Sequence, residues 1–324
     1  MSHSLAWAAP QRPGGLEGAR RFLAQAKAEQ TAVLFVGHGS RDPEGNAELL
    51  RFTAALASRL SVPIVETGFL ELTRPTIAEG IARCVDRGAA HVVVVPISLF
   101  AAGHAKLHIP ATIDEARERY PSVRFTYARP VGVHDKVLAI LLDRLREAGF
   151  SPDDPDREET AVLVVGRGSS DPDANSDLFK ISRLLWERTR VGWVETAFAG
   201  VTAPLLEEGL ARCVRLGATR IFVVPYFLFT GVLIRRMAEQ VAAFAARHPD
   251  RQVRLARYFG LHPLIGDILL ERAEEALRGE VRMSCDLCAY RLAAKAGSSH
   301  HAHDHHDPHP HPHGERVAGK EEAR

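Results

Sequence analysis

Two histidines and a glutamate recur at a regular spacing in the first half of the 324-residue chain. His38 lies in GHGS, Glu71 lies 33 residues later in ETGFLEL, and His104 follows after another 33 residues in LFAAGHAKLHIP. Imidazole and carboxylate are suitable ligands for a divalent first-row metal ion, and a neutral imidazole also accepts protons. These residue types therefore indicate a site that binds a metal ion, transfers a proton, or does both.

An internal repeat relates the two halves of the chain. AVLFVGHGSRDP at residues 32–43 aligns with AVLVVGRGSSDP at residues 161–172, an offset of 129 residues. At this offset the three polar residues correspond, in order, to Arg167, Gly200 and Leu233. The second half has lost all three groups together while the surrounding sequence stays recognisable. This joint loss favours a shared function over three independent surface residues, and it predicts one active and one degenerate half.

Short β-branched runs alternate with longer segments of helical periodicity in each half, which is typical of βαβ units and a parallel sheet. In the first half we expect strands at residues 33–36, 63–69, 91–96 and 123–128, and helices at 44–60, 76–87, 105–119 and 136–148. Runs such as HVVVVP indicate strands buried on both faces. The expected fold class is α/β, with a small doubly wound parallel sheet flanked by helices in each half. Ligands bind such sheets at the carboxyl ends of the strands, where the three polar residues are expected.

Composition and charge exclude several classes of protein. The chain has 41 Lys+Arg against 40 Asp+Glu, a net charge of +1, which argues against a nucleic-acid partner. No apolar run approaches the ~18 residues that span a bilayer, and the N-terminus lacks the features of a secretory signal. We therefore expect a cytoplasmic protein with no membrane partner.

The GHGSRDP turn, the FLEL segment, the PISLFAAGHAKLHIP segment and the duplication together resemble the class II tetrapyrrole chelatases. Within that group the resemblance is specifically to the long, two-domain sirohydrochlorin cobaltochelatases of the CbiX type. It implies insertion of Co(II), as substrate metal, into sirohydrochlorin without ATP during cobalamin biosynthesis. It also implies that His38 and His104 act as metal ligands or proton acceptors, with Glu71 completing the site. Members of this family often have an acidic residue before the Ile-Pro of the last motif, where this chain has His108.

The resemblance also sets the expected domains and substrate contacts. We expect an N-terminal extension (1–30), a catalytic chelatase-like domain (31–150), a linker (151–160), a degenerate chelatase-like repeat (161–280) and a disordered tail (281–324). Sirohydrochlorin carries several carboxylates, so cations near the motifs are candidate substrate contacts. These are Arg41, Arg74, Lys106 and Arg129, with Arg235 and Arg236 in the second half.

The tail has two features of its own. Cys285 and Cys288 form a CxxC pair, which supplies half of the four ligands that a structural zinc or an iron–sulfur cluster requires. Nearby histidines or a second chain in a homodimer could complete such a site, or the pair could be a redox dithiol. The resemblance implies the iron–sulfur cluster. Eight of the 16 histidines lie between His300 and His313, a composition suited to metal buffering or delivery.

Two alternative functions remain open. A sirohydrochlorin ferrochelatase, which serves sirohaem synthesis, would use the same residues, and the tail favours cobalt over iron. A metal-storage protein or metallochaperone would need the tail but not the three spaced polar residues. Four other residues are assigned structural roles: helix capping or packing for His134 and His262, and burial in the core for Cys84 and Cys213.

Overall fold

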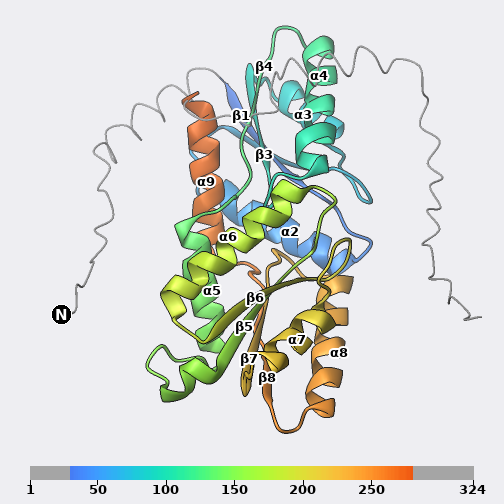
Figure 1. Cartoon of the computed structure of the whole chain (residues 1–324). Coiled ribbons are helices and arrows are strands. Elements are labelled where there is room, and N and C mark those ends of the chain that lie inside the picture. Colours follow the sequence, from blue (N-terminus) through green and yellow to red (C-terminus); the bar gives the residue numbers. More distant parts are fainter. Residues whose placement is uncertain (1–29, 280–324) are drawn as a thin grey trace, which may run out of the picture. The chain divides into compact units, whose positions relative to one another are not determined.

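The computed structural model describes residues 30–279, which form two sequential sets of strands and helices (Figure 1). The first half contains β1 (Thr31–Gly37), α2 (Pro43–Ala57), β2 (Ile64–Phe69), α3 (Ile77–Asp86), β3 (His91–Pro96), a π-helix (His104–His108), α4 (Ile109–Arg119), β4 (Arg124–Tyr127) and α5 (Asp135–Glu147). The second half contains a 3-10 helix (Pro155–Glu159), β5 (Thr160–Gly166), α6 (Pro172–Thr189), β6 (Trp193–Phe198), α7 (Leu206–Arg215), β7 (Arg220–Pro225), α8 (Val232–Arg247), β8 (Gln252–Leu255) and α9 (Pro263–Leu277). The expected N-terminal extension and the tail with Cys285 and Cys288 lie outside the described residues.

Each half forms a four-stranded parallel sheet, with the orders β2-β1-β3-β4 and β6-β5-β7-β8. The register repeats as well: Ala32 pairs with Ile64 and Val92, and its equivalent Ala161 pairs with Trp193 and Ile221. The predicted fold class, two duplicated doubly wound α/β sheets, is confirmed. One expected helix differs, because the segment that opens with His104 forms a π-helix before α4 begins.

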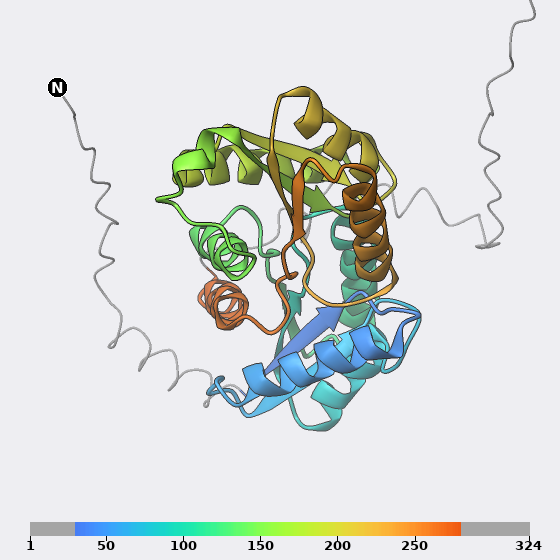
Figure 2. The same ribbon diagram turned by 90° about the horizontal axis from the view of Figure 1, so that it is seen from below.

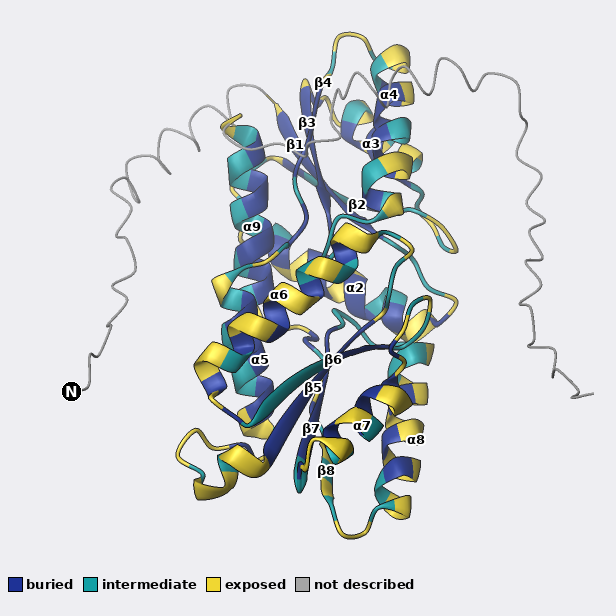
Figure 3. Cartoon of the chain, in the orientation of Figure 1, coloured by how far each residue is buried: buried dark blue, intermediate teal, exposed yellow. Residues whose placement is uncertain are grey.

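Burial on both faces explains the apolar strands (Figure 3). Every residue of β1 and β3 is buried. Val33 and Phe35 of β1 pack in a core with α2, whereas Ala32 and Leu34 face a separate core with α3 and α4. Alternate residues of a strand point to opposite faces, so an unbroken apolar run is what a sheet covered by helices on both sides requires.

The last helix of each half packs on the sheet of the other half. α9 contacts β3 and β4 of the first sheet, α5 contacts β7 of the second, and the two helices contact each other (Figure 2). One continuous core accordingly includes Val93 of β3 with Ile268 of α9, and Phe222 of β7 with Leu141 of α5. The repeat therefore describes the order of elements along the chain, while the packing of the helices crosses between the halves.

Two buried arginines anchor α5 and α9, the helices that pack on the sheet of the other half (the exchanged helices). Arg144 of α5 donates to the carbonyl oxygen of Phe259 at 2.7 Å, and Arg272 of α9 donates to those of Pro130 at 3.1 Å and Val131 at 3.0 Å. Both arginines are buried, at 7% and 2% exposure. A guanidinium group has several donors in a fixed fork, which suits it to satisfying backbone carbonyls that the strands leave unpaired.

His134 and His262 cap these same helices. The Nδ1 atom of His134 accepts from the backbone of α5, and its Nε2 atom lies 3.2 Å from Oε2 of Glu271 in α9. His262 caps α9 in the same way, and its Nε2 atom lies 3.5 Å from Oδ2 of Asp143 in α5. The predicted capping and packing role of both histidines is confirmed.

The remaining structural predictions concern Cys84 and Cys213. Both side chains are fully buried in the sheet–helix cores. Burial raises the pKa of each thiol to about 12, so both remain protonated near neutral pH. Their assignment to the core is confirmed. Within residues 30–279, no helix has the length and apolar character needed to cross a membrane.

Candidate metal site

The three residues singled out by their spacing lie together at the carboxyl edge of the first sheet. One ligand atom from each of His38, Glu71 and His104 lies within 4.8 Å of the others, and no comparable group occurs elsewhere in residues 30–279. His38 follows β1 and His104 lies beyond β3, the two central strands between which the chain order reverses. This switch point is where doubly wound sheets bind their ligands.

A tight turn brings His38 to Glu71. Gly39 has a φ of 91°, and a Cβ atom there would lie 1.9 Å from the carbonyl oxygen of Glu71, so the turn requires glycine. The backbone N–H of Glu71 donates to the carbonyl oxygen of His38 at 3.0 Å. The side chains then meet, with Nδ1 of His38 3.6 Å from Oε1 of Glu71. The GHGS turn thus fixes the distance between two of the three groups.

The hydrogen bonding of His38 leaves one ring nitrogen available. Its Nδ1 atom lies 3.1 Å from the carbonyl oxygen of Gly39. A carbonyl only accepts, so this bond places the ring proton on Nδ1 and leaves a lone pair on Nε2. The Nε2 atom is buried and has no hydrogen-bond partner among residues 30–279. A buried nitrogen without a partner is costly unless a ligand uses it, which suits Nε2 to binding a metal ion or accepting a proton.

His104 contacts both other histidines of this region. Its ring lies edge-on to that of His38, with centroids 4.8 Å apart, and its Nδ1 atom is 2.8 Å from Nδ1 of His108. Burial, followed by the neighbouring His38 and His108, lowers the pKa of His104 below its ordinary value of 6.5. The neutral form, which can bind a metal ion, therefore prevails at neutral pH.

The structure places His108 in direct contact with His104, which the sequence alone did not establish. Between two neutral imidazoles one nitrogen must donate and the other accept. If His104 donates from Nδ1, its Nε2 atom keeps a lone pair for a metal ion. In that arrangement His108 would hold His104 in the tautomer that can bind a metal ion. The only signal in the sequence was its position four residues after His104, and the π-helix sets the contact between the rings.

The four cations expected to bind substrate lie in different environments. Nζ of Lys106 is 2.6 Å from Oδ2 of Asp171 across the two halves. Arg74 pairs with Glu79 at 3.0 Å, whereas Arg41 is exposed. Arg129 donates through Nε and Nη2 to Glu275 of α9, each at 2.9 Å. Carboxylates of the protein itself thus already engage three of the four, and their predicted role in binding substrate stays a prediction.

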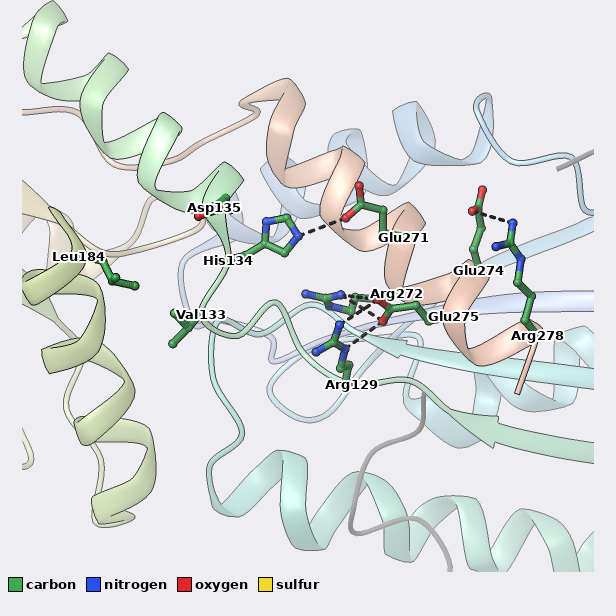
Figure 4. Close-up of a pocket in the computed structure, with 10 residues that line it drawn as sticks. All are labelled: Arg129, Val133, His134, Asp135, Leu184, Glu271, Arg272, Glu274, Glu275 and Arg278. Atoms are coloured by element: carbon green, nitrogen blue, oxygen red, sulfur yellow. Dashed lines mark hydrogen bonds and ion pairs between the residues drawn. The ribbon is translucent and has the colours of Figure 1, made fainter. Parts of the chain in front are cut away.

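Arg129 lines a pocket of about 550 Å³ beside the exchanged helices (Figure 4). Basic and acidic side chains of the lining are paired: Arg272 and Arg129 both donate to Glu275, and His134 is hydrogen-bonded to Glu271. None of the three metal-ligand candidates lines it. Because its charged groups bond one another, we interpret this pocket as part of the packing between α5 and α9.

A CbiX sequence model matches residues 32–148 and again 161–276. The chain is 56% identical over 270 residues to the sirohydrochlorin cobaltochelatase of Priestia megaterium, covering 83% of this chain and 88% of the relative. It is 37% identical to the sirohydrochlorin ferrochelatase of Bacillus subtilis, covering 81% of this chain and 98% of the relative. Among solved structures, the sirohydrochlorin chelatase SirB from Bacillus subtilis subspecies spizizenii in complex with cobalt matches with a TM-score of 0.66 at 34% identity, covering 77% of this chain and 96% of that one.

The duplicated parallel sheets define an α/β protein built as a two-fold repeat, and residues 30–279 carry one His–Glu–His group that could hold a metal ion. The chain belongs to the CbiX family, whose model matches both halves. The resemblance found in the sequence motifs is thereby confirmed.

Proposed function

We propose that this protein is a chelatase that inserts Co(II) into sirohydrochlorin. The observation that carries the proposal is the convergence of His38, Glu71 and His104 at the switch point of the first sheet. The similarity to a sirohydrochlorin cobaltochelatase at 56% identity supports both the substrate and the metal. The assignment to cobalamin biosynthesis and to the cytoplasm belongs to the same proposal.

The chemistry of insertion requires the groups that this site offers. Two pyrrole N–H protons leave the macrocycle as the divalent metal exchanges its water ligands for ring nitrogens, so each turnover releases two protons. Neutral imidazoles can hold the incoming metal ion and can accept those protons. The free lone pair on Nε2 of His38 and the lowered pKa of His104 favour these roles. Glu71 contributes a carboxylate that offsets positive charge as metal and protons pass through the site.

An anaerobic absorbance assay with sirohydrochlorin and Co(II) tests the proposal. We expect the free macrocycle spectrum to be replaced by that of the cobalt complex, and His38→Ala to abolish the change. An absence of insertion by the wild-type protein with either Co(II) or Fe(II) would contradict a chelatase and favour metal storage. A variant that keeps the wild-type rate would place the reaction elsewhere.

Iron is the second candidate metal, because a sirohydrochlorin ferrochelatase is 37% identical over 264 residues. The ligand set binds Co(II) and Fe(II) by the same chemistry, and affinity in such sites rises from Fe(II) to Co(II). We expect the cobalt rate to exceed the iron rate when both metals are supplied at equal free concentration. An iron–sulfur cluster or a homodimer contact at Cys285 and Cys288 stays a prediction from the sequence, since neither residue is described.

The pH dependence of insertion follows from the lowered pKa of His104. A protonated imidazole neither binds a metal ion nor accepts a proton, so activity requires the neutral ring. Because the pKa lies below 6.5, the neutral form already dominates at pH 6.5. We expect the rate at saturating Co(II) to be maximal at neutral pH and to fall as the pH decreases below 6.5. Initial rates measured across this range check the prediction, and a half-maximal rate above pH 6.5 would contradict it.

A further inference from the structure

Arg167 occupies, on the second sheet, the position that His38 occupies on the first. It directly follows β5, as His38 follows β1, and the same tight turn holds it. Gly168 has a φ of 88°, and a Cβ atom there would lie 2.0 Å from the carbonyl oxygen of Gly200. The backbone that presented a metal ligand in the first half therefore presents a guanidinium group at the carboxyl edge of the second sheet.

Two equivalent ion pairs join the carboxyl edges of the sheets. Lys106 pairs with Asp171 at 2.6 Å, and its repeat equivalent Arg235 pairs with Asp42 at 2.7 Å. Lys106 lies two residues after His104, and Asp171 lies four residues after Arg167. The turn that carries Arg167 thus faces the π-helix that carries His104.

Arg167 differs from these neighbouring cations in having no carboxylate of its own. Lys106 and Arg235 are both paired across the halves, whereas Arg167 is exposed and has no ion pair or hydrogen bond within residues 30–279. An unpaired cation beside a metal site repels the metal ion and the protons that gather there. Its charge becomes favourable when an anion binds between it and the site.

We propose that Arg167 binds a carboxylate of the tetrapyrrole and so positions the macrocycle over His38 and His104. This inference rests on the proposed function, since it takes the substrate to be a polycarboxylate macrocycle. The guanidinium fork can bind a carboxylate through two hydrogen bonds, which fixes direction as well as distance. The second half, which has lost its metal ligands, then contributes a positioning residue to the site of the first.

Arg167→Ala tests this role through the affinity for substrate. We expect the dissociation constant for metal-free sirohydrochlorin, titrated by absorbance, to rise about tenfold, as for the loss of one charge-assisted contact. The KM for sirohydrochlorin should rise to a similar extent while the KM for Co(II) does not rise. Arg167→Lys should recover part of the affinity, because it restores the charge without the fork. The control is Arg215→Ala, an exposed arginine at the end of α7, which should bind as the wild type does.

An unchanged dissociation constant for sirohydrochlorin in Arg167→Ala would overturn the inference. If Co(II) also binds that variant more tightly, Arg167 acts in metal release instead. The titration needs no turnover, so it distinguishes this failure from failure of the proposed function. If the wild-type protein binds the macrocycle through Arg167 but inserts no metal, the chelatase assignment is wrong and the role of Arg167 in binding still holds.

Discussion

His104→Ala is expected to reduce the rate of cobalt insertion by about 10³-fold, within the range for loss of a general base. The substitution removes a nitrogen that lies in the His–Glu–His group and is held neutral by burial. It also removes the ring that contacts His108. Binding of metal-free sirohydrochlorin should persist, because the substitution leaves unchanged Arg167, the residue proposed to bind a carboxylate of the macrocycle. Insertion rates and a substrate titration of the same variant measure both effects.

His248→Ala provides the matched control for this prediction. His248 follows the last residue of α8 and stacks on Phe244, at the end of the second half remote from the strand ends that carry the site. We expect its rate to equal that of the wild-type protein. Near-normal turnover by His104→Ala would contradict the assigned chemistry. Equal losses in both variants would instead indicate a general effect of removing a histidine.

The sequence predicted much of this site because repeat and spacing carry the relevant information. His38 follows β1, whose apolar run is unambiguous, Glu71 follows the neighbouring strand β2, and parallel strands bring their carboxyl ends to one edge. Comparison with Arg167 and Gly200 then separated functional residues from scaffold. The contact between His104 and His108 could not be predicted in detail, because it depends on a π-helix, which helical periodicity does not distinguish from an α-helix.

The sequence also could not predict that α5 and α9 each pack on the sheet of the other half. Each helix has an apolar face suited to covering a parallel sheet, and the two sheets are near copies, so periodicity does not indicate which sheet a helix covers. The partners of Arg129 were hidden for the same reason. It lies 146 residues from Glu275, and only the exchange brings them together. A cation that looks free in the sequence is thus bound within the fold.

Arg272→Ala is expected to lower the free energy of unfolding by about 3–5 kcal/mol, because two buried carbonyl oxygens lose their donor at about 1–3 kcal/mol each. The side chain is 2% exposed and donates to the carbonyl oxygens of Pro130 and Val131. Its removal leaves both carbonyl oxygens without this donor, while Glu275 keeps its ion pair with Arg129. At roughly 2–4 °C per kcal/mol for a protein of this size, the midpoint of thermal unfolding should fall by about 10 °C.

Arg183→Ala controls for the loss of a surface arginine. Its side chain is 67% exposed and pairs with Glu187 one turn along α6. Such pairs contribute less than about 1 kcal/mol, so this variant should unfold close to the wild type. A loss below about 1 kcal/mol in Arg272→Ala would contradict the role of Arg272 in holding α9. Since α9 covers the first sheet and α5 the second, the destabilised protein should still unfold in one transition. Two separate transitions would show that the halves fold independently despite the exchange.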